Sequence, residues 1–274
     1  MLPYNLQLQE LLVENATKPS PKEDEKCLDI FPFLKLSERG FYFEAEGLAS
    51  FFISAERKIH NKVYKRTATY QDYLHNMVTA LHLLQKSFLL LHGNSFIFKD
   101  QHIAICGESR AGKSSLAAQF HSQGALFFCD EIICFNQKNT ALPGYPFLRL
   151  WENDIVYNQF DPNLITQLWD NEDKFKLNTS NQNFCEERKV DILVYLDTDE
   201  KINTPEIKEI KGIEKVKTFW ASYYHPKVID AMNLTSAFNQ QSLDIIKQIK
   251  IFKLIRPNNH ESKKDCLELL KQVL

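Results

Sequence analysis

The sequence predicts an α/β protein in which helices flank a mixed sheet. Short apolar runs of strand length recur along the chain, and VDILVYLDT at 190–198 is the clearest of them. Longer segments with apolar residues at helical spacing alternate with these runs, as in YQDYLHNMVTALHLLQKS at 70–87. Because strands and helices are intermixed along the chain, the helices are expected to pack on a sheet.

The first part of the chain, residues 1–85, is expected to form a small α+β region. The polar, proline-containing stretch at 16–26 is typical of a loop. FYFEAEG at 41–47 and ASFFISAE at 49–56 have the composition of strands, and together they predict a hairpin. The basic segment RKIHNKVYKR at 57–66 predicts a solvated face or the edge of a sheet.

The histidines and cysteines show no metal-ligand spacing. His75 and His82 share nearly one face of the predicted helix at 70–87, but no third ligand accompanies them, so they are interpreted as ordinary, partly buried histidines. The cysteines are scattered without the Cys-x-x-Cys or Cys/His spacing of a zinc site. They are interpreted as buried thiols of a cytoplasmic protein. The six cysteines stand at positions 27, 106, 129, 134, 185 and 266.

From residue 86 onward the pattern predicts one larger domain, 86–274. A strand pair is expected at its start, followed by a helix that ends before Gly124 and by two short apolar strands. The predicted strands are 89–98, 102–106, 125–129, 132–136, 190–198 and 251–257, and the predicted helices are 113–122, 216–234, 243–250 and 263–274.

Charge and hydropathy exclude two classes of partner. The 274 residues include 33 Lys and Arg against 35 Asp and Glu, so no basic excess points to nucleic acid. No apolar run approaches the ~18 residues of a membrane-spanning helix. The first residues lack the basic and then apolar pattern of a secretory signal, so none is expected.

A phosphate-binding motif lies between the predicted strand at 102–106 and the predicted helix at 113–122. The sequence GESRAGKSS satisfies the Walker A pattern, in which a strand–loop–helix turn directs backbone N–H groups at phosphates. In this pattern the lysine reaches the β- and γ-phosphates, and the first serine binds Mg²⁺. The alternative is a glycine-capped turn with an incidental lysine. The predicted nucleotide-binding residues are Gly107, Glu108, Ser109, Arg110, Ala111, Gly112, Lys113, Ser114 and Ser115.

Two adjacent carboxylates follow the loop at short range. Asp130 and Glu131 end the apolar run ALFFC, and Asp130 lies only 17 residues after Lys113. One helix leading out and one strand leading back would return both carboxylates to the phosphates. There one could hold Mg²⁺ with Ser114 while the other accepts a proton from an incoming hydroxyl. The alternative is a solvated Asp-Glu hairpin turn.

A histidine precedes the loop. His92 lies 15 residues before Gly107, at the tip of the preceding apolar run. It either contacts the transferred phosphate, as a catalytic residue beside Asp130 and Glu131, or has a structural role.

These residues together carry a family resemblance. The segment LLHGNSFIFKDQHIAICGESRAGKSSLAAQFHSQGALFFCDE resembles the core of the HPr kinase/phosphorylase family, in which a Leu-His strand, a loop ending Gly-Lys-Ser, a helix and an acid pair follow in this order. LPGYPFLRLW at 142–151 resembles a segment of shorter HPr-kinase-like proteins found beside peptide-modifying enzymes, including lasso-peptide systems. The resemblance covers about residues 88–151, and residues 1–85 match no family that we can name.

The resemblance implies a fold and an activity. It implies a P-loop core for 86–274 like that of HPr kinase and phosphoenolpyruvate carboxykinase, and Mg-ATP-dependent phosphorylation of a serine on a peptide or small protein. By position, it makes Asp130 the catalytic carboxylate, Glu131 its metal-linked neighbour and His92 a phosphate contact. It also allows a homo-oligomer, and residues 1–85 could then recognise the acceptor.

Three features depart from the family pattern. Arg110 stands where the full-length enzymes usually have glycine, and it either clamps a phosphate oxygen or faces solvent. The second acid is Glu131 rather than aspartate, and its longer side chain could shift the metal. LIRPNN at 254–259 is not the signature linked to phosphorylase activity, which argues against reverse phosphorolysis and against HPr itself as the substrate.

The sequence therefore favours an HPr-kinase-like serine kinase that uses ATP and Mg²⁺. Two alternatives remain: a small-molecule kinase or phosphatase of the same fold, and a non-catalytic nucleotide-binding regulator in a peptide-modification complex. Arg149 is either a substrate contact or a structural residue. The aromatic residues Trp220, Tyr223 and Tyr224 either touch substrate or belong to the core.

Overall fold

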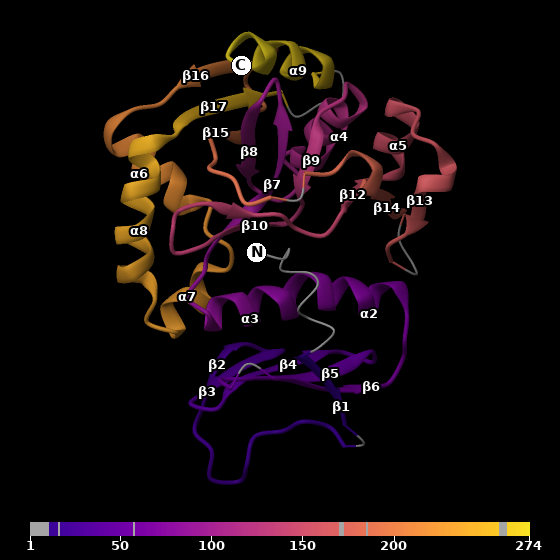
Figure 1. Cartoon of the computed structure of the whole chain (residues 1–274), viewed down its shortest axis with the longest axis vertical. Helices are drawn as coiled ribbons and strands as arrows, with labels where there is room; N and C mark the ends of the chain where they lie inside the picture. The colour runs from indigo at the N-terminus through magenta and orange to yellow at the C-terminus, as the bar shows by residue number, and fades with distance from the viewer. Residues whose placement is uncertain (1–10, 16, 57, 170–172, 185, 258–261) are drawn as a thin grey trace.

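Three sheets with flanking helices make up a mixed α/β fold, which confirms the fold class predicted from the sequence. The computed structural model describes residues 11–15, 17–56, 58–169, 173–184, 186–257 and 262–274. The sheet of strands β1 to β6 lies at one end of the molecule, at the bottom of Figure 1, and a long helical segment separates it from the two sheets that follow.

The first sheet has six strands in the order β1-β6-β5-β4-β3-β2. The predicted hairpin is confirmed, because β4 and β5 pair antiparallel on either side of a turn at Gly47. Phe43 and Phe51 stack across this pair with ring centroids 5.7 Å apart. The strands are β1 (Leu12–Glu14), β2 (Cys27–Phe31), β3 (Leu34–Ser37), β4 (Gly40–Ala45), β5 (Ala49–Ser54) and β6 (Ile59–Val63).

The prediction that the basic segment at 57–66 forms a solvated face or the edge of a sheet is confirmed only in part. Lys58, Lys65 and Arg66 are exposed, as a solvated face requires. The strand within it is nevertheless not an edge, because β6 pairs with β5 on one side and with β1 on the other. Ile59 is fully buried there, so the strand is placed by the burial of this apolar side chain, despite the charged residues around it. Residue 57 lies outside the described residues.

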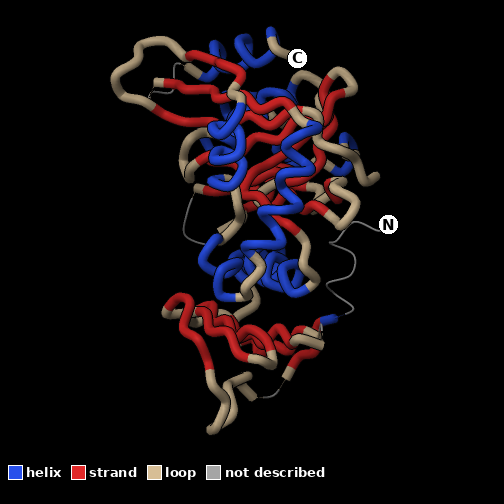
Figure 2. The backbone as a smooth tube through the Cα atoms, turned by 90° about the vertical axis from the view of Figure 1, so that its left-hand side faces the viewer, coloured by secondary structure: helices blue, strands red, loops and turns tan. Residues whose placement is uncertain are grey.

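A continuous helical segment covers the first sheet and turns its other side toward the second (Figures 1 and 2). It consists of α2 (Ala68–Tyr73), a π-helical turn (Leu74–Val78) and α3 (Thr79–Gln85), where the sequence predicted one uninterrupted helix. Thr67 caps its N-terminus by accepting a hydrogen bond from the backbone of Tyr70. Leu81 and Leu84 are fully buried and belong to a hydrophobic cluster that also includes residues of both the first and the second sheet.

The two histidines of this segment are packed rather than assembled into a metal site. His82 is buried, whereas His75 is half-buried and its ring lies 4.2 Å from that of Tyr145. The described residues hold no group of three or more His, Cys, Asp or Glu side chains placed to bind a metal on their own.

The second sheet positions the predicted phosphate loop. Its order is β11-β10-β7-β8-β15-β17-β16, and β9 pairs with β7 beside this path. The three central strands β8, β15 and β17 run parallel, and the others are antiparallel to their neighbours. The strands are β7 (Leu89–Phe98), β8 (Gln101–Gly107), β9 (Leu126–Cys129), β10 (Ile132–Phe135), β11 (Ala141–Leu142), β15 (Ile192–Thr198), β16 (Glu206–Glu209) and β17 (Lys250–Arg256).

Helices pack on both faces of this sheet. Side chains of β8 alternate between two hydrophobic clusters: Ile103 and Ile105 pack with α4 and α9, whereas Ala104 faces the cluster of α6 and α8. A helix was predicted in each of these regions, but the predicted helix at 216–234 is broken after residue 221, and α8 begins eight residues before the predicted helix at 243–250 and ends two residues before its predicted end. The helices are α4 (Lys113–Ser122), α6 (Gly212–Ala221), α7 (Pro226–Ala231), α8 (Thr235–Gln248) and α9 (Lys263–Gln272).

A small third sheet was not predicted. Its strands β12 (Phe147–Trp151), β14 (Lys174–Asn178) and β13 (Ile165–Gln167) pair antiparallel in that order, and α5 (Glu152–Asn158) follows β12. The hydrophobic residues of β12 pack against α4, so this sheet lies beside the loop that precedes α4.

Two expectations about composition can be compared with this fold. Of the described cysteines, four are buried and Cys27 is half-buried, whereas Cys185 lies outside the described residues. Among the described segments, no helix is both long and apolar enough to cross a membrane.

The buried histidine of β8 makes the stability of the fold depend on pH. The His102 ring packs 4.2 Å from Phe128, with Nε2 3.0 Å from Ser95 Oγ and Nδ1 3.2 Å from the Lys189 carbonyl, which can only accept. Burial lowers the pKa of His102 from 6.5 to about 3. The unfolded chain therefore takes up a proton first as the pH falls, and stability present above pH 6.5 is lost below it.

We predict that the H102Q variant has a flatter dependence of its free energy of unfolding on pH. Between about pH 6 and 5, denaturant titrations should show a slope smaller than that of the wild type by about 1 kcal/mol per pH unit, because one proton-uptake step is removed. The slope is compared rather than the absolute stability, since the substitution also removes packing. An unchanged slope would contradict this account of His102.

Candidate functional site

The turn from β8 into α4 requires both of its glycines. Gly107 has φ +142°, and a Cβ there would lie 2.2 Å from the Leu196 carbonyl of β15. Gly112 has φ +103° at the N-cap of α4, where a Cβ would lie 3.3 Å from Arg256 Nε. Only glycine adopts such angles readily. The glycines of the motif thus let the loop pass close to the neighbouring parallel strands and place the N-terminus of α4 at the end of the sheet.

The lysine of the motif is held inside the loop. Lys113 is only 9% exposed, and its Nζ donates hydrogen bonds to the carbonyls of Gly107 and Glu108 at 2.9 and 3.0 Å. Burial lowers the pKa of Lys113, while the carboxylate of Glu131 acts in the opposite direction. The ammonium group is therefore already directed at the concave side of the loop.

The acid pair occupies the connection between β9 and β10. Glu131 has φ +70°, an uncommon left-handed conformation for this residue type. Together with Asp130 it forms a two-residue break between β9 and β10, which follow one another along β7 and both pair antiparallel with it. Asp130 is 9% exposed, and burial raises the pKa of its carboxyl. Burial acts on Glu131 in the same way, but the neighbouring groups His92 and Arg149 hold the pKa of Glu131 below its ordinary value. The two adjacent carboxyls are thus shifted in opposite directions.

His92 lies beside the second acid of the pair. It stands in β7 opposite Ile132 of β10, and its Nε2 is 3.5 Å from Glu131 Oε1. Burial lowers the pKa of His92. Its side chain is 35% exposed. The antiparallel pairing of β7 and β10 therefore brings together two predicted site residues that are far apart in the chain.

A buried arginine links the acid pair to the N-terminal helix. The backbone N–H of Arg149 donates to Asp130 Oδ2 at 2.8 Å, and its guanidinium Nη1 lies 3.7 Å from the same oxygen. The guanidinium Nε donates to Asp72 Oδ1 of α2 at 2.8 Å. Trp169 Nε1 donates to the second oxygen of Asp72 at 2.9 Å. Each of the three charged side chains is less than 10% exposed.

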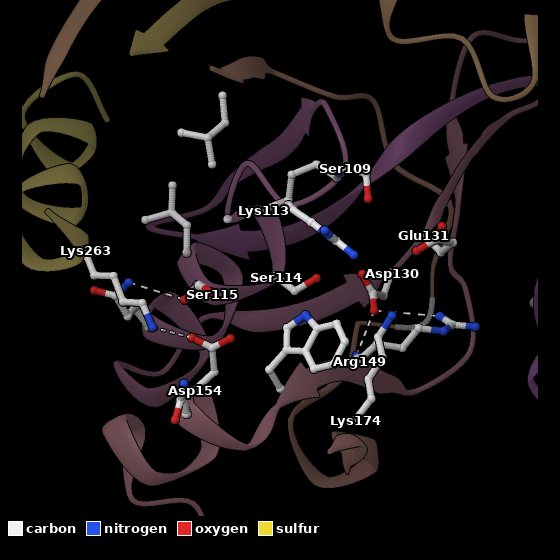
Figure 3. Close-up of a pocket in the computed structure, with 18 of the residues that line it drawn as sticks. Ser109, Lys113, Ser114, Ser115, Asp130, Glu131, Arg149, Asp154, Lys174 and Lys263 are labelled. Atoms are coloured by element: carbon white, nitrogen blue, oxygen red, sulfur yellow. Dashed lines mark hydrogen bonds and ion pairs between the residues drawn. The ribbon is translucent and has the colours of Figure 1, made fainter. Parts of the chain in front are cut away.

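These groups border a cavity of about 840 Å³ (Figure 3). Lys113, Ser114, Asp130 and Glu131 all point into it, from the loop on one side and the β9–β10 connection on the other. Of the predicted site residues, those that line the cavity are His92, Ser109, Arg110, Gly112, Lys113, Ser114, Ser115, Asp130 and Glu131. Gly107, Glu108 and Ala111 belong to the loop but do not line the cavity, and Ala111 instead accepts a hydrogen bond from Arg256 through its carbonyl.

Several lining residues were not predicted as site residues. Lys263 of α9 pairs with Asp154 of α5 at 2.7 Å, and Lys174 of β14 lies 4.4 Å from the ring of Trp169. They come from the small sheet and its β13–β14 connection, from α5, and from β17 and α9. Apart from Trp151, which ends the segment at 142–151, no pattern in the sequence pointed to them as site residues. These additional lining residues are Trp151, Glu152, Asn153, Asp154, Trp169, Asp173, Lys174, Arg256 and Lys263.

The aromatic residues at 219–225 pack on the core, and one of them also borders a cavity. Tyr223 is 8% exposed and belongs to the core, whereas Trp220 is half-buried against it and donates to Ser242 Oγ. Neither residue lines the cavity. Tyr224 is buried to 3% exposure, yet it borders a second, smaller cavity.

The oxygen donors in the larger cavity suit Mg²⁺. This ion uses one or two carboxylates together with substrate phosphates and water, rather than a complete cage of protein ligands. Ser114, Asp130 and Glu131 supply a hydroxyl and two carboxylates to one cavity that also holds the phosphate loop. The residues present therefore fit a nucleotide-bound magnesium ion.

Comparisons with known proteins add little to this geometry. No protein-family model matches the chain, and no curated protein matches it. Among solved structures, the chain is similar to the Hpr(Ser) kinase/phosphatase from Coxiella burnetii, at 13% sequence identity over 67% of this chain and 89% of that one. The TM-score is 0.36, too low for the likeness to support any conclusion about this chain.

We predict that removing Asp72 strongly destabilises the fold. Taking away one partner of a buried ion pair leaves a buried charge incompletely compensated, which costs about 3–5 kcal/mol. The D72A variant should show this loss in its free energy of unfolding, measured by denaturant titration.

A matched exposed pair provides the control. Asp244 and Lys247 lie 2.9 Å apart with side chains 48% and 72% exposed. D244A should cost less than about 1 kcal/mol, because water solvates both groups and screens the pair. If D72A lowered the free energy of unfolding by no more than D244A does, the claim that the Asp72–Arg149 pair joins α2 to the site would be contradicted.

Proposed function

We propose that this protein is a Mg-ATP-dependent phosphotransferase of the HPr-kinase-like type, which phosphorylates a serine hydroxyl on a peptide or small protein. The observation that supports this most directly is the meeting of Lys113, Ser114 and the Asp130–Glu131 pair in one cavity. A glycine-capped turn with an incidental lysine would not require an acid pair opposite it. The sequence resemblance over residues 88–151 supports the same reading.

In this proposal the loop binds the triphosphate. Backbone N–H groups of residues 107–114 and the N-terminus of α4 face the β- and γ-phosphates, and Lys113 exchanges its contacts with the Gly107 and Glu108 carbonyls for phosphate oxygens. Arg110, exposed in the loop and lining the cavity, would contact the outer side of the phosphates. Bound magnesium would neutralise charge that develops on the phosphates.

The geometry favours a division of labour within the acid pair. Asp130 lines only the larger cavity, with Ser114, and one of its oxygens accepts from the Arg149 backbone, so we assign it to the metal. Glu131 lines both cavities and lies beside His92, so we assign it to the acceptor hydroxyl. This reverses the roles that the family resemblance implies for the two carboxylates.

The remaining assignments rest on the resemblance. We propose that residues 86–274 form an HPr-kinase-like P-loop domain and that residues 1–85 contribute to acceptor recognition. A cytoplasmic location, a role beside peptide-modifying enzymes and a homo-oligomeric state belong to the same proposal.

The expected kinetic behaviour separates catalysis from binding. We predict that K113A weakens nucleotide binding and that D130N retains it, while both lower Mg-dependent ATP turnover about a hundredfold or more, because transition-state charge loses its partners. Turnover is measured by phosphate release or transfer, and binding by titration with a non-hydrolysable ATP analogue.

Two exposed residues away from the cavity serve as controls. K217A on α6 and D244N on α8 make the same kinds of change and should leave binding and turnover at wild-type values. Tight nucleotide binding by the wild type with no turnover, even with candidate acceptors present, would contradict the kinase proposal and favour a nucleotide-binding regulator.

A further inference from the structure

A second cavity borders Glu131 of the acid pair. It measures about 280 Å³ and shares three residues with the larger cavity: His92, Glu131 and Trp169. No residue of the phosphate loop lines it. A molecule in this cavity would therefore reach Glu131 without contacting the loop that holds the triphosphate in the proposed function.

The N-terminal helical segment forms one wall of this cavity. Thr69, Asp72 and Tyr73 come from α2, and Asn76 and Met77 come from the π-helical turn. A π-helical turn inside an α-helix is rare and often marks a functional site. Here it places two consecutive side chains at the cavity, and Asn76 accepts a hydrogen bond from Tyr224 Oη of the opposite wall.

The opposite wall is built around an unusual backbone conformation. His225 has φ +49°, left-handed for a non-glycine residue, immediately before α7. This conformation brings its ring against that of Tyr224, with centroids 4.4 Å apart. A non-glycine residue held in this region costs free energy, and such residues cluster where a site needs a particular geometry.

The size and charge of the cavity restrict what it can hold. Its volume is just below the usual range for small-molecule sites, so it suits a group of about one amino-acid residue. The charged side chains lining it in the described part of the chain are two carboxylates, Asp72 and Glu131, with no lysine or arginine among them. The rings of Tyr73, Trp169, Tyr224 and His225 supply flat apolar surfaces. Asp72 is already paired with Arg149, so Glu131 is the carboxylate that disfavours an anion, and an uncharged group fits better.

We infer that this cavity is the acceptor pocket, and that it takes an uncharged, hydroxyl-bearing group the size of one serine residue between the N-terminal helical segment and Glu131. This inference rests on the proposed phosphotransferase function. In the step, the acceptor oxygen bonds to the γ-phosphorus, and the bond from that phosphorus to the β–γ bridging oxygen breaks. ADP leaves with the electron pair, and the hydroxyl proton passes to Glu131.

The test uses small probes and a cavity-filling variant. N-acetyl-L-serine amide is the uncharged probe, and N-acetyl-L-serine, with its free carboxylate, is the anionic one. Phosphate transfer from γ-labelled ATP is measured for the wild type and for the M77W variant, whose larger side chain fills the cavity. The affinity for a non-hydrolysable ATP analogue is measured in the same samples.

A second variant and a control guard against misfolding. H225N removes the ring while keeping a residue type that tolerates the left-handed conformation. I213W places the same large side chain at a position of α6 that is 67% exposed and lines neither cavity. Thermal unfolding of each variant confirms that the fold is retained.

The expected result is transfer to the amide at least tenfold more efficient in kcat/KM than to the free acid. M77W should lower transfer at least tenfold, H225N should raise the KM for the amide, and neither should change the affinity for the ATP analogue. I213W should behave as the wild type.

Each contrary result would overturn a particular part of the proposal. Failure of the wild type to bind the ATP analogue would refute the proposed function itself. Nucleotide binding without transfer to the amide, or preference for the free acid, would refute the acceptor class. If M77W, H225N and I213W all transferred phosphate to the amide as efficiently as the wild type, the acceptor would bind outside this cavity.

Discussion

The guanidinium of Arg149 is the point at which the layers of this protein meet. It comes from the small third sheet, pairs with Asp72 of the N-terminal helical segment, and lies beside Asp130 at the end of β9. Removing these charges from water costs several kcal/mol per ion, which only close geometry and further hydrogen bonds can offset. The Arg149 N–H and the Trp169 indole supply such bonds. The network therefore fixes where the acid pair stands relative to α2.

This arrangement explains how a short connection becomes a site. Asp130 and Glu131 occupy a two-residue break between β9 and β10, two strands that pair one after the other with β7. The Arg149 backbone fixes one carboxylate, and the antiparallel partner strand β7 brings His92 to the other. The phosphate loop faces them from the end of β8, where the parallel neighbour β15 leaves no room for a side chain at Gly107. Sheet pairing thus holds both halves of the site.

The features that could be predicted from the sequence are those that depend on residues close together in the chain. The helix at 113–122 and the strand at 89–98 have the predicted bounds, because each has a clear period and a clear stop. The phosphate loop and the acid pair were visible for the same reason, since their residues are close together in the chain. Their roles stay predictions, although the structure directs both into one cavity.

What the sequence did not show depends on distant partners. Asp72 is one polar residue in an amphipathic helix, and only the fold places it 2.8 Å from Arg149, which is 77 residues later. The third sheet was missed because its strands are short and partly polar, and pairing rather than local preference holds them. The π-helical turn likewise could not be predicted, because the apolar residues around it keep the spacing of an ordinary helix. The second cavity, which these elements surround, could not have been predicted from the sequence.

The central claim is that the cavity at the end of β8 holds Mg-ATP between the loop and the acid pair. A crystal structure with magnesium and a non-hydrolysable ATP analogue tests it most directly. The account predicts the β- and γ-phosphates against residues 107–114, Lys113 Nζ moved from the loop carbonyls to phosphate oxygens, and the metal on Ser114 and Asp130. A triphosphate bound outside the loop, with Lys113 still on the Gly107 and Glu108 carbonyls, would contradict it.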